Sequence, residues 1–142
     1  MVDGNDELED RQDGRLRFSE DGASGVAQLL IVLERVGGGV CVLSIEGELD
    51  LYAEPVFQRA LAASLEDGPT KLVVDLTKCT LIDSTGLGAL LKANKRFSDG
   101  SNVHIDVACP DSSIRKIFEI TALNRIFALH ETRAAALDGA GG

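Results

Sequence analysis

The sequence is poor in aromatic residues and in positive charge. Its 142 residues include one tyrosine and no tryptophan, and aromatics make up 4% against 44% hydrophobic residues. A chain of this length has room for one domain with a proper core, and that core has to be aliphatic. Lysine and arginine number 14 against 23 acidic residues, so the formal net charge is -9. Without a basic surface, we expect neither nucleic acid nor an anionic membrane as a partner.

Long apolar runs and targeting signals are missing as well. No run approaches the roughly 20 residues of a membrane helix, and Met1 is followed by acidic residues rather than by the basic and apolar stretches of a signal peptide. We therefore expect a cytoplasmic protein whose Cys41, Cys79 and Cys109 are reduced. Their spacing matches no metal motif, and neither a Walker sequence nor G-x-G-x-x-G occurs. The sequence predicts no metal site and no cofactor.

Negative charge is concentrated at the N-terminus. Residues 1–25 hold eight acidic side chains against three arginines and show no hydrophobic period. Such a composition is typical of disorder. We predict an acidic, disordered extension over 1–25, a folded domain over 26–137 and a disordered tail over 138–142.

The folded part opens with two runs rich in β-branched residues, 29–36 and 40–49, joined by three glycines. Glycines at this position permit positive φ and predict a β-hairpin. Helical and strand-like segments then alternate. Apolar periodicity and stop signals predict helices over 53–68, 83–100, 112–123 and 132–137, and strands over 71–77, 102–109 and 125–131. The order β-β-α-β-α-β-α-β-α predicts an α/β fold with a mixed sheet, because crossovers give parallel pairs and the hairpin an antiparallel one.

The stretch CTLIDSTGLGALL, residues 79–91, leaves the carboxyl end of a predicted parallel strand, where functional loops are often found. Asp83 or Ser84 can cap the following helix by accepting from free amides. Each of Gly86 and Gly88 costs about 1 kcal/mol in a helix relative to alanine, so both need a reason. They would permit close approach to neighbouring strands or leave a flat, exposed surface. The simplest interpretation is a capped, tightly packed helix start.

Two other interpretations give Ser84 a function. Phosphorylation would place about -1.5 to -2 charges on an exposed helix start, which the helix amides tolerate but a docked partner beside Asp83 would not. Ser84 would then be a switch. Alternatively, Ser84 would be a nucleophile with His104 or His130 as its base. The sequence I-D-S-T-G lacks the G-x-S-x-G pattern of a nucleophile elbow, so we expect no enzyme.

Three separated segments resemble one known family in the right order. They are VVDLTKCTLIDSTGLGALL (73–91), IEGELD (45–50) and IRKIFEITALNRIFALHET (114–132). This pattern resembles that of anti-sigma factor antagonists, which are built on the STAS domain, and it covers about residues 27–137. The acidic extension has no counterpart in the short members of that family. The resemblance implies a STAS-type mixed sheet with helices packed on it.

The resemblance also implies a function and a site. Such antagonists bind an anti-sigma factor that is also a serine kinase and so free a sigma factor. The kinase phosphorylates the serine after the motif aspartate, here Ser84 with Thr85 as a secondary site, and a serine phosphatase resets it. The implied contact residues are Glu48, Asp50, Asp83, Ser84, Thr85, Gly86, Leu87 and Gly88. The alternative is a STAS scaffold module of a larger sensory or transport assembly.

Two cysteines follow neighbouring strands along the chain. Cys79 comes after the strand predicted over 71–77, and Cys109 ends the next parallel strand. If those strand ends are adjacent, the sulfurs approach disulfide range and form a candidate redox pair. The alternative interpretation is two small, buried thiols in a reducing compartment.

Overall fold

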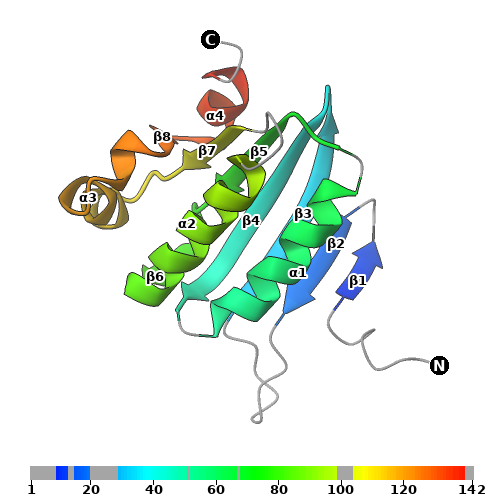
Figure 1. The fold of residues 1–142 in the computed structure, drawn as a ribbon, viewed down its shortest axis with the longest axis horizontal. Coiled ribbons are helices and arrows are strands. Elements are labelled where there is room, and N and C mark those ends of the chain that lie inside the picture. The colour runs from blue at the N-terminus through cyan, green and yellow to red at the C-terminus, as the bar shows by residue number, and fades with distance from the viewer. Residues whose placement is uncertain are drawn as a thin grey trace.

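The structure, a computed structural model, describes residues 9–12, 15–19, 29–50, 52–66, 68–98 and 104–139. Its strands form one mixed, 8-stranded sheet in the order β1-β2-β3-β4-β5-β7-β8, with β6 paired to β4 (Figure 1). The strands are β1 (Glu9–Gln12), β2 (Arg15–Ser19), β3 (Leu29–Gly37), β4 (Val40–Leu49), β5 (Lys71–Asp75), β6 (Cys79–Ile82), β7 (His104–Ala108) and β8 (Ala128–His130). The helices are α1 (Ala53–Leu65), α2 (Ser84–Ser98), α3 (Ser112–Ile120) and α4 (Arg133–Gly139), with a 3-10 turn η2 (Leu123–Arg125). The predicted fold class is confirmed.

The opening hairpin is formed as predicted. Strands β3 and β4 pair antiparallel, with Ile31 opposite Ile45 and Leu33 opposite Leu43. The connecting glycines, 37–39, all have positive φ, between 64° and 93°. Residues with a Cβ rarely adopt that backbone conformation, so the triple glycine determines where the chain reverses.

Helices cover both faces of the sheet. Helices α1 and α2 lie side by side across one face (Figure 1), and α4 packs on the other face against β5, β7 and β8. Alternation along β5 shows the two layers, because Leu72 and Val74 join the large core whereas Val73 joins a small cluster with Ala136 of α4. All five residues of β5 are therefore buried, as expected for a strand covered on both sides.

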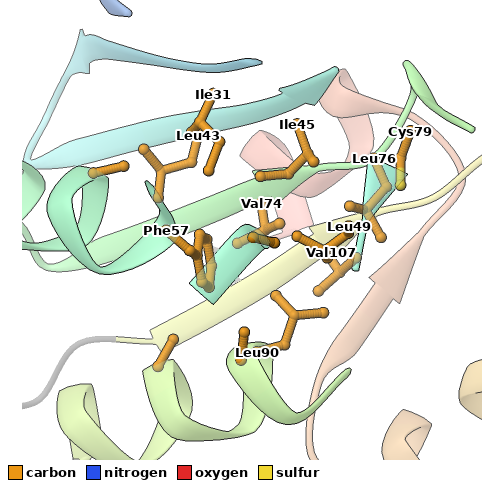
Figure 2. Packing of buried hydrophobic residues seen from close by; sticks show 14 of the residues in the cluster. Ile31, Leu43, Ile45, Leu49, Phe57, Val74, Leu76, Cys79, Leu90 and Val107 are labelled. Carbon is orange, nitrogen blue, oxygen red and sulfur yellow. The ribbon is translucent and has the colours of Figure 1, made fainter. Parts of the chain in front are cut away.

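The large core is aliphatic with a few phenylalanines. Figure 2 shows Phe57 of α1 and Leu90 of α2 directed at the sheet, where Val74 and Val107 lie. All four side chains are fully buried. Full burial of side chains of this size contributes about 1.5–3 kcal/mol each to the free energy of unfolding, so these contacts anchor both helices to the sheet.

Strand β6 was not predicted. Strand β4 pairs in parallel with β5 along its first half, through Ser44, and with β6 along its second half, from Gly47 to Leu49. Between the two, the Asp75 carboxylate accepts from the backbone N–H and hydroxyl of Thr77, at 2.9 and 2.5 Å. This turn transfers the chain from one half of β4 to the other, and it brings β6 and the start of α2 to the C-terminal end of β4.

The predictions for both termini need correction. Residues 1–25 were expected to be disordered, yet β1 and β2 extend the sheet beyond β3. Leu16 and Phe18 of β2 are buried in the core, which explains the order despite the acidic composition. At the other end, α4 continues through residues 138 and 139 of the expected tail. Residues 140–142, and those of 1–25 outside β1 and β2, lie outside the described residues.

Within the described ranges, the helices are all too short or too polar to cross a membrane.

Candidate functional site

The start of α2 is capped by Asp83. Its Oδ1 accepts from the backbone N–H of Gly86 at 2.9 Å, and its carbonyl oxygen accepts from Leu87 N–H at 2.9 Å. An aspartate at this position satisfies a helix N–H that has no intrahelical acceptor. Of the two capping residues that the sequence allowed, the structure selects Asp83. The hydroxyl of Ser84 is thereby released from the capping role.

Ser84 is the first residue of α2, and its side chain is exposed. Across the part of the chain that the structure describes, its hydroxyl has no hydrogen-bond partner. Thr85 beside it is half-buried. An exposed hydroxyl without a structural contact, next to the positive end of a helix dipole, can carry a phosphate without loss of an existing interaction.

The two glycines of α2 serve different purposes. A Cβ on Gly86 would lie 2.0 Å from the carbonyl oxygen of Leu49, whereas a Cβ on Gly88 would meet nothing within 4 Å. Gly86 permits the close approach of α2 to β4, which is one of the two reasons offered by the sequence analysis. Gly88 has open space at its Cβ position and is half-buried.

Leu87 does not belong to the accessible site. Its side chain is 7% exposed and packs in the large core, and Gly86 is buried against Leu49. The side chain of Leu87 and the Cα of Gly86 offer little accessible area in this conformation, and their contact with a partner stays a prediction. Leu87 lies three residues before the buried Leu90 and so on the same side of α2. Gly86 and Leu87 therefore hold α2 against the core.

The loop after β4 lies beside the start of α2. The Leu49 carbonyl, already in contact with Gly86, also accepts from the backbone N–H of Asp83 at 3.3 Å. Glu48 is paired with Leu81 in the β4–β6 ladder. Asp50 accepts from the N–H of Tyr52 at 3.0 Å. The end of β4 and the loop after it thus lie next to the segment that carries Asp83 and Ser84, and a role of Glu48 and Asp50 as contact residues stays a prediction.

The sequence is similar to those of known proteins. Residues 31–136 match the sequence family described as the STAS domain. The anti-sigma-F factor antagonist RsfB of Mycobacterium tuberculosis is 34% identical over 104 residues, which are 73% of this chain and 84% of that protein.

The chain belongs to the STAS-domain family of anti-sigma factor antagonists.

Solved structures agree with the fold of this STAS protein. An anti-sigma factor antagonist from Mycobacterium paratuberculosis superposes with a TM-score of 0.66 at 27% identity, covering 78% of this chain and 92% of that one. The Bacillus cell fate determinant SpoIIAA in its phosphorylated form superposes with a TM-score of 0.59 at 22% identity, covering 78% of this chain and 98% of that one. The second likeness shows the fold alone.

Three exposed apolar side chains belong to α2 or to the segments next to Asp50 and Asp83 in the chain, and the sequence analysis did not name them as contact residues. Tyr52 is 60% exposed, Leu81 46% and Leu91 37%. Leu91 follows Ser84 by seven residues and Gly88 by three. Ser84, Gly88 and Leu91 therefore share one face of α2. Tyr52 is the only tyrosine of the chain, which is a signal that sequence reasoning could have used. Leu81 pairs with Glu48, next to the core pair of Leu49 and Ile82, and so faces the side of the sheet opposite α2. We call Asp50, Tyr52, Asp83, Ser84, Gly88 and Leu91 the switch surface.

The predicted redox pair consists of buried, free thiols. Burial raises the pKa of Cys79 and raises the pKa of Cys109 to about 11. The thiolate charge of Cys79 also contributes to the raised pKa of Cys109, so the two sulfurs lie within electrostatic range. Thiolates rather than thiols take part in disulfide exchange. The environment therefore favours the interpretation as small buried thiols.

Neither histidine is placed as a catalytic base for Ser84. His130 Nε2 lies 2.8 Å from Asp106 Oδ2, and Lys71 Nζ lies 3.7 Å from the same oxygen. His104 is exposed at the start of β7. The described residues include no hydrogen bond between Ser84 and a histidine. Asp106 is 8% exposed because α4 covers its face of the sheet.

Proposed function

We propose that this protein is an anti-sigma factor antagonist controlled by phosphorylation. Its unphosphorylated form binds an anti-sigma factor that is also a serine kinase, and the sigma factor is released. The kinase phosphorylates Ser84, which separates the complex, and a serine phosphatase restores the binding form. The protein acts by binding, without a reaction of its own. The name of the Mycobacterium tuberculosis relative supports the class of partner.

One observation carries the proposal: Asp83, not Ser84, caps α2, and the Ser84 hydroxyl is exposed and uncommitted. A kinase can therefore modify Ser84 without dismantling the helix start. Thr85 is half-buried, so we assign it a secondary role at most. The exposed side chains of Tyr52 and Leu91 provide apolar area for a partner.

Phosphorylation would then act on binding and not on folding. In the free protein, a phosphate on Ser84 is exposed to water and lies at the positive end of α2. In a complex centred on the switch surface, the same phosphate would be desolvated next to the Asp83 carboxylate. Burial of like charges side by side costs several kcal/mol, so the complex dissociates.

The test is a pull-down from the lysate of the source organism with wild type, Ser84→Ala and Ser84→Glu as baits. We expect wild type to retain an anti-sigma factor of the kinase type, to lose it when ATP is added, and to gain one phosphate on Ser84. Ser84→Ala should retain the same protein with ATP, and Ser84→Glu should retain little of it. Thr85→Ala is the matched control and should behave like wild type.

A different pattern would contradict the proposal. Equal retention by wild type and Ser84→Glu would show that Ser84 does not control binding. Phosphate found on Thr85 while Ser84 stays unmodified would move the switch by one residue.

A further inference from the structure

A groove of about 580 Å³ lies on the sheet face opposite α1 and α2, beside α4. Its β3 lining consists of Leu30, Val32 and Glu34, which alternate with the core residues of that strand. The switch surface belongs to the start of α2 on the other side of the sheet. A ligand in this groove would therefore leave the switch surface free. The volume falls within the range of about 300–1,000 Å³ that is usual for small-molecule sites.

The floor of the groove is one row of residues across four strands. Arg17 of β2 pairs with Val32 of β3, Val32 with Ser44 of β4, and Ser44 with Asp75 of β5. Residues paired in this way point to the same face of a sheet. Within the groove, the row runs from a guanidinium across apolar and hydroxyl side chains to a carboxylate, and beyond the groove Arg17 pairs with Asp10 of β1.

The carboxylate end of the row is already neutralised. Arg133 of α4 donates from Nε to Asp75 Oδ2 at 2.8 Å, from Nη2 to the Ser44 hydroxyl at 2.5 Å and from Nη1 to Glu34 at 3.3 Å. Three bonds of this kind hold the Arg133 guanidinium in place. A ligand at this end would have to displace an established network, so Arg133 is a wall of the groove.

At the other end of the groove, the Arg17 guanidinium has an atom without a hydrogen-bond acceptor. Arg17 has no ion pair or hydrogen bond within the described ranges, and its Nη1 atom is buried without an acceptor. Its neighbours are only loosely paired, Arg15 with Glu34 at 3.7 Å and Lys78 with Glu46 at 3.9 Å. A buried donor without an acceptor is unfavourable, so an anion that allows the Arg17 guanidinium to turn toward it relieves this cost.

Charge in the groove differs in sign from that of the whole chain. Arg15, Arg17, Lys78 and Arg133 line it together with three carboxylates, those of Glu34, Glu46 and Asp75. This leaves one positive charge in excess, in a chain whose formal net charge is -9. Leu30 and Val32 lie beside the unpaired guanidinium and offer apolar surface to a flat or aliphatic group.

We propose that the groove binds a small organic anion, with a phosphate or carboxylate on Arg17 and an apolar or aromatic body on Leu30 and Val32. A single anionic group matches the single excess charge. An apolar body would pack against Leu30 and Val32, the part of the floor without polar side chains. This site is separate from the switch surface, and it does not depend on the identity of the anti-sigma factor.

The test uses three probes that share one ring system: 1-naphthyl phosphate, 1-naphthoate and neutral 1-naphthol. Each is titrated into the ¹⁵N-labelled full chain, and amide chemical shifts are followed by NMR. We expect one or both anions to shift the amides of Arg17, Val32 and Ser44, and 1-naphthol to bind at least about tenfold more weakly. Comparison of the two anions shows whether the site prefers phosphate or carboxylate.

Arg17→Gln is the test variant and Arg125→Gln the matched control. Arg125 is exposed on η2, so both variants lose one positive charge but only one lies in the groove. Arg17→Gln should weaken anion binding about tenfold or more, the usual effect of losing a charge-assisted hydrogen bond, and Arg125→Gln should not. Thermal unfolding confirms that each variant is folded.

Three results would overturn the inference. The first is the absence of shifts at the groove amides of the wild-type chain at millimolar anion, which needs no variant. The second is equal affinity of Arg17→Gln and wild type. The third is equal affinity for the anions and 1-naphthol. Chemical-shift changes confined to the start of α2 would also overturn the inference, because they would show that the anion binds at the helix N-terminus and not in the groove.

Discussion

A Cβ atom on Gly86 would lie 2.0 Å from the carbonyl oxygen of Leu49. The first turn of α2 therefore rests directly on the C-terminal end of β4. The same carbonyl accepts from the backbone N–H of Asp83, so this contact fixes the helix start next to the loop that carries Asp50 and Tyr52. The switch surface depends on a glycine that is itself buried.

The first prediction concerns the two glycines of α2. Gly86→Ala should lower the free energy of unfolding by about 1–3 kcal/mol or more, because the clash is with backbone and cannot be relieved by a rotamer change. Gly88→Ala should raise it by up to about 1 kcal/mol, because the helix gains propensity and the methyl group meets nothing. Urea unfolding at neutral pH measures both. Equal effects of the two substitutions would contradict the difference in packing.

The second prediction separates the cap from the switch. Asp83→Ala should cost about 1 kcal/mol of unfolding free energy, the usual effect of losing an N-cap, and Asp83→Asn should cost less. Ser84→Ala should change it by no more than about 0.5 kcal/mol, because the hydroxyl forms no hydrogen bond with the residues that the structure describes. Denaturant unfolding of the three variants checks this. A destabilised Ser84→Ala would show that Ser84 has the structural role we assign to Asp83.

The third prediction concerns acid stability. Burial by itself raises the pKa of Asp75, but hydrogen bonds from Thr77 and Arg133 outweigh it and hold the pKa below its usual value of 3.8. The stabilisation is therefore complete above the unfolded-state value and is lost as the pH falls through the lower, folded-state value. We expect Asp75→Asn to be less sensitive to pH than wild type below about pH 4.

The partner of Asp75 gives the matched experiment. Arg133→Met should lower the free energy of unfolding at pH 7 by about 2–4 kcal/mol, because it leaves a buried carboxylate with fewer donors. It should also bring the pKa of Asp75 upward. The exposed Arg125→Met should stay within about 0.5 kcal/mol of wild type. If wild type and Asp75→Asn lost stability in parallel on acidification, another group would be responsible.

The fourth prediction concerns the cysteines. With the pKa of Cys109 near 11 and that of Cys79 raised, little thiolate exists at pH 8. Iodoacetamide should modify both cysteines about a hundredfold more slowly in the native protein than in urea. Intact mass after mild oxidation should correspond to the fully reduced chain. An internal Cys79–Cys109 disulfide under those conditions would support the redox interpretation instead.

Much of the fold follows from local signals. The three glycines predict the hairpin, and apolar periodicity predicts α1, α2 and β5. Strand β2 was missed because overall acidity dominated the interpretation, although Leu16 and Phe18 alternate with polar residues. Strand β6 was missed because four residues are too few for a period, and pairing with the distant Glu48 and Leu49 stabilises it.

The site was predictable in part. The residues Asp83 and Ser84 and the two glycines stand together in the sequence, and their types indicate a helix start. Which residue caps, and which glycine touches β4, depends on contacts with Leu49, far away along the chain. No local sequence pattern predicts the groove, because Arg17 and Arg133 are far apart along the chain and line the same groove only once the sheet has formed. Burial of Leu87 likewise depends on the rotation of α2 about its axis.

The most direct test of the account is the affinity of one anti-sigma factor for two forms of this protein. The anti-sigma factor recovered with wild type is purified and titrated by calorimetry with the unmodified chain and with the chain phosphorylated at Ser84. We predict that the phosphate weakens binding about a hundredfold or more, while the unfolding free energy of the free protein changes little. Equal affinities of the two forms would contradict the proposal that Ser84 is the switch.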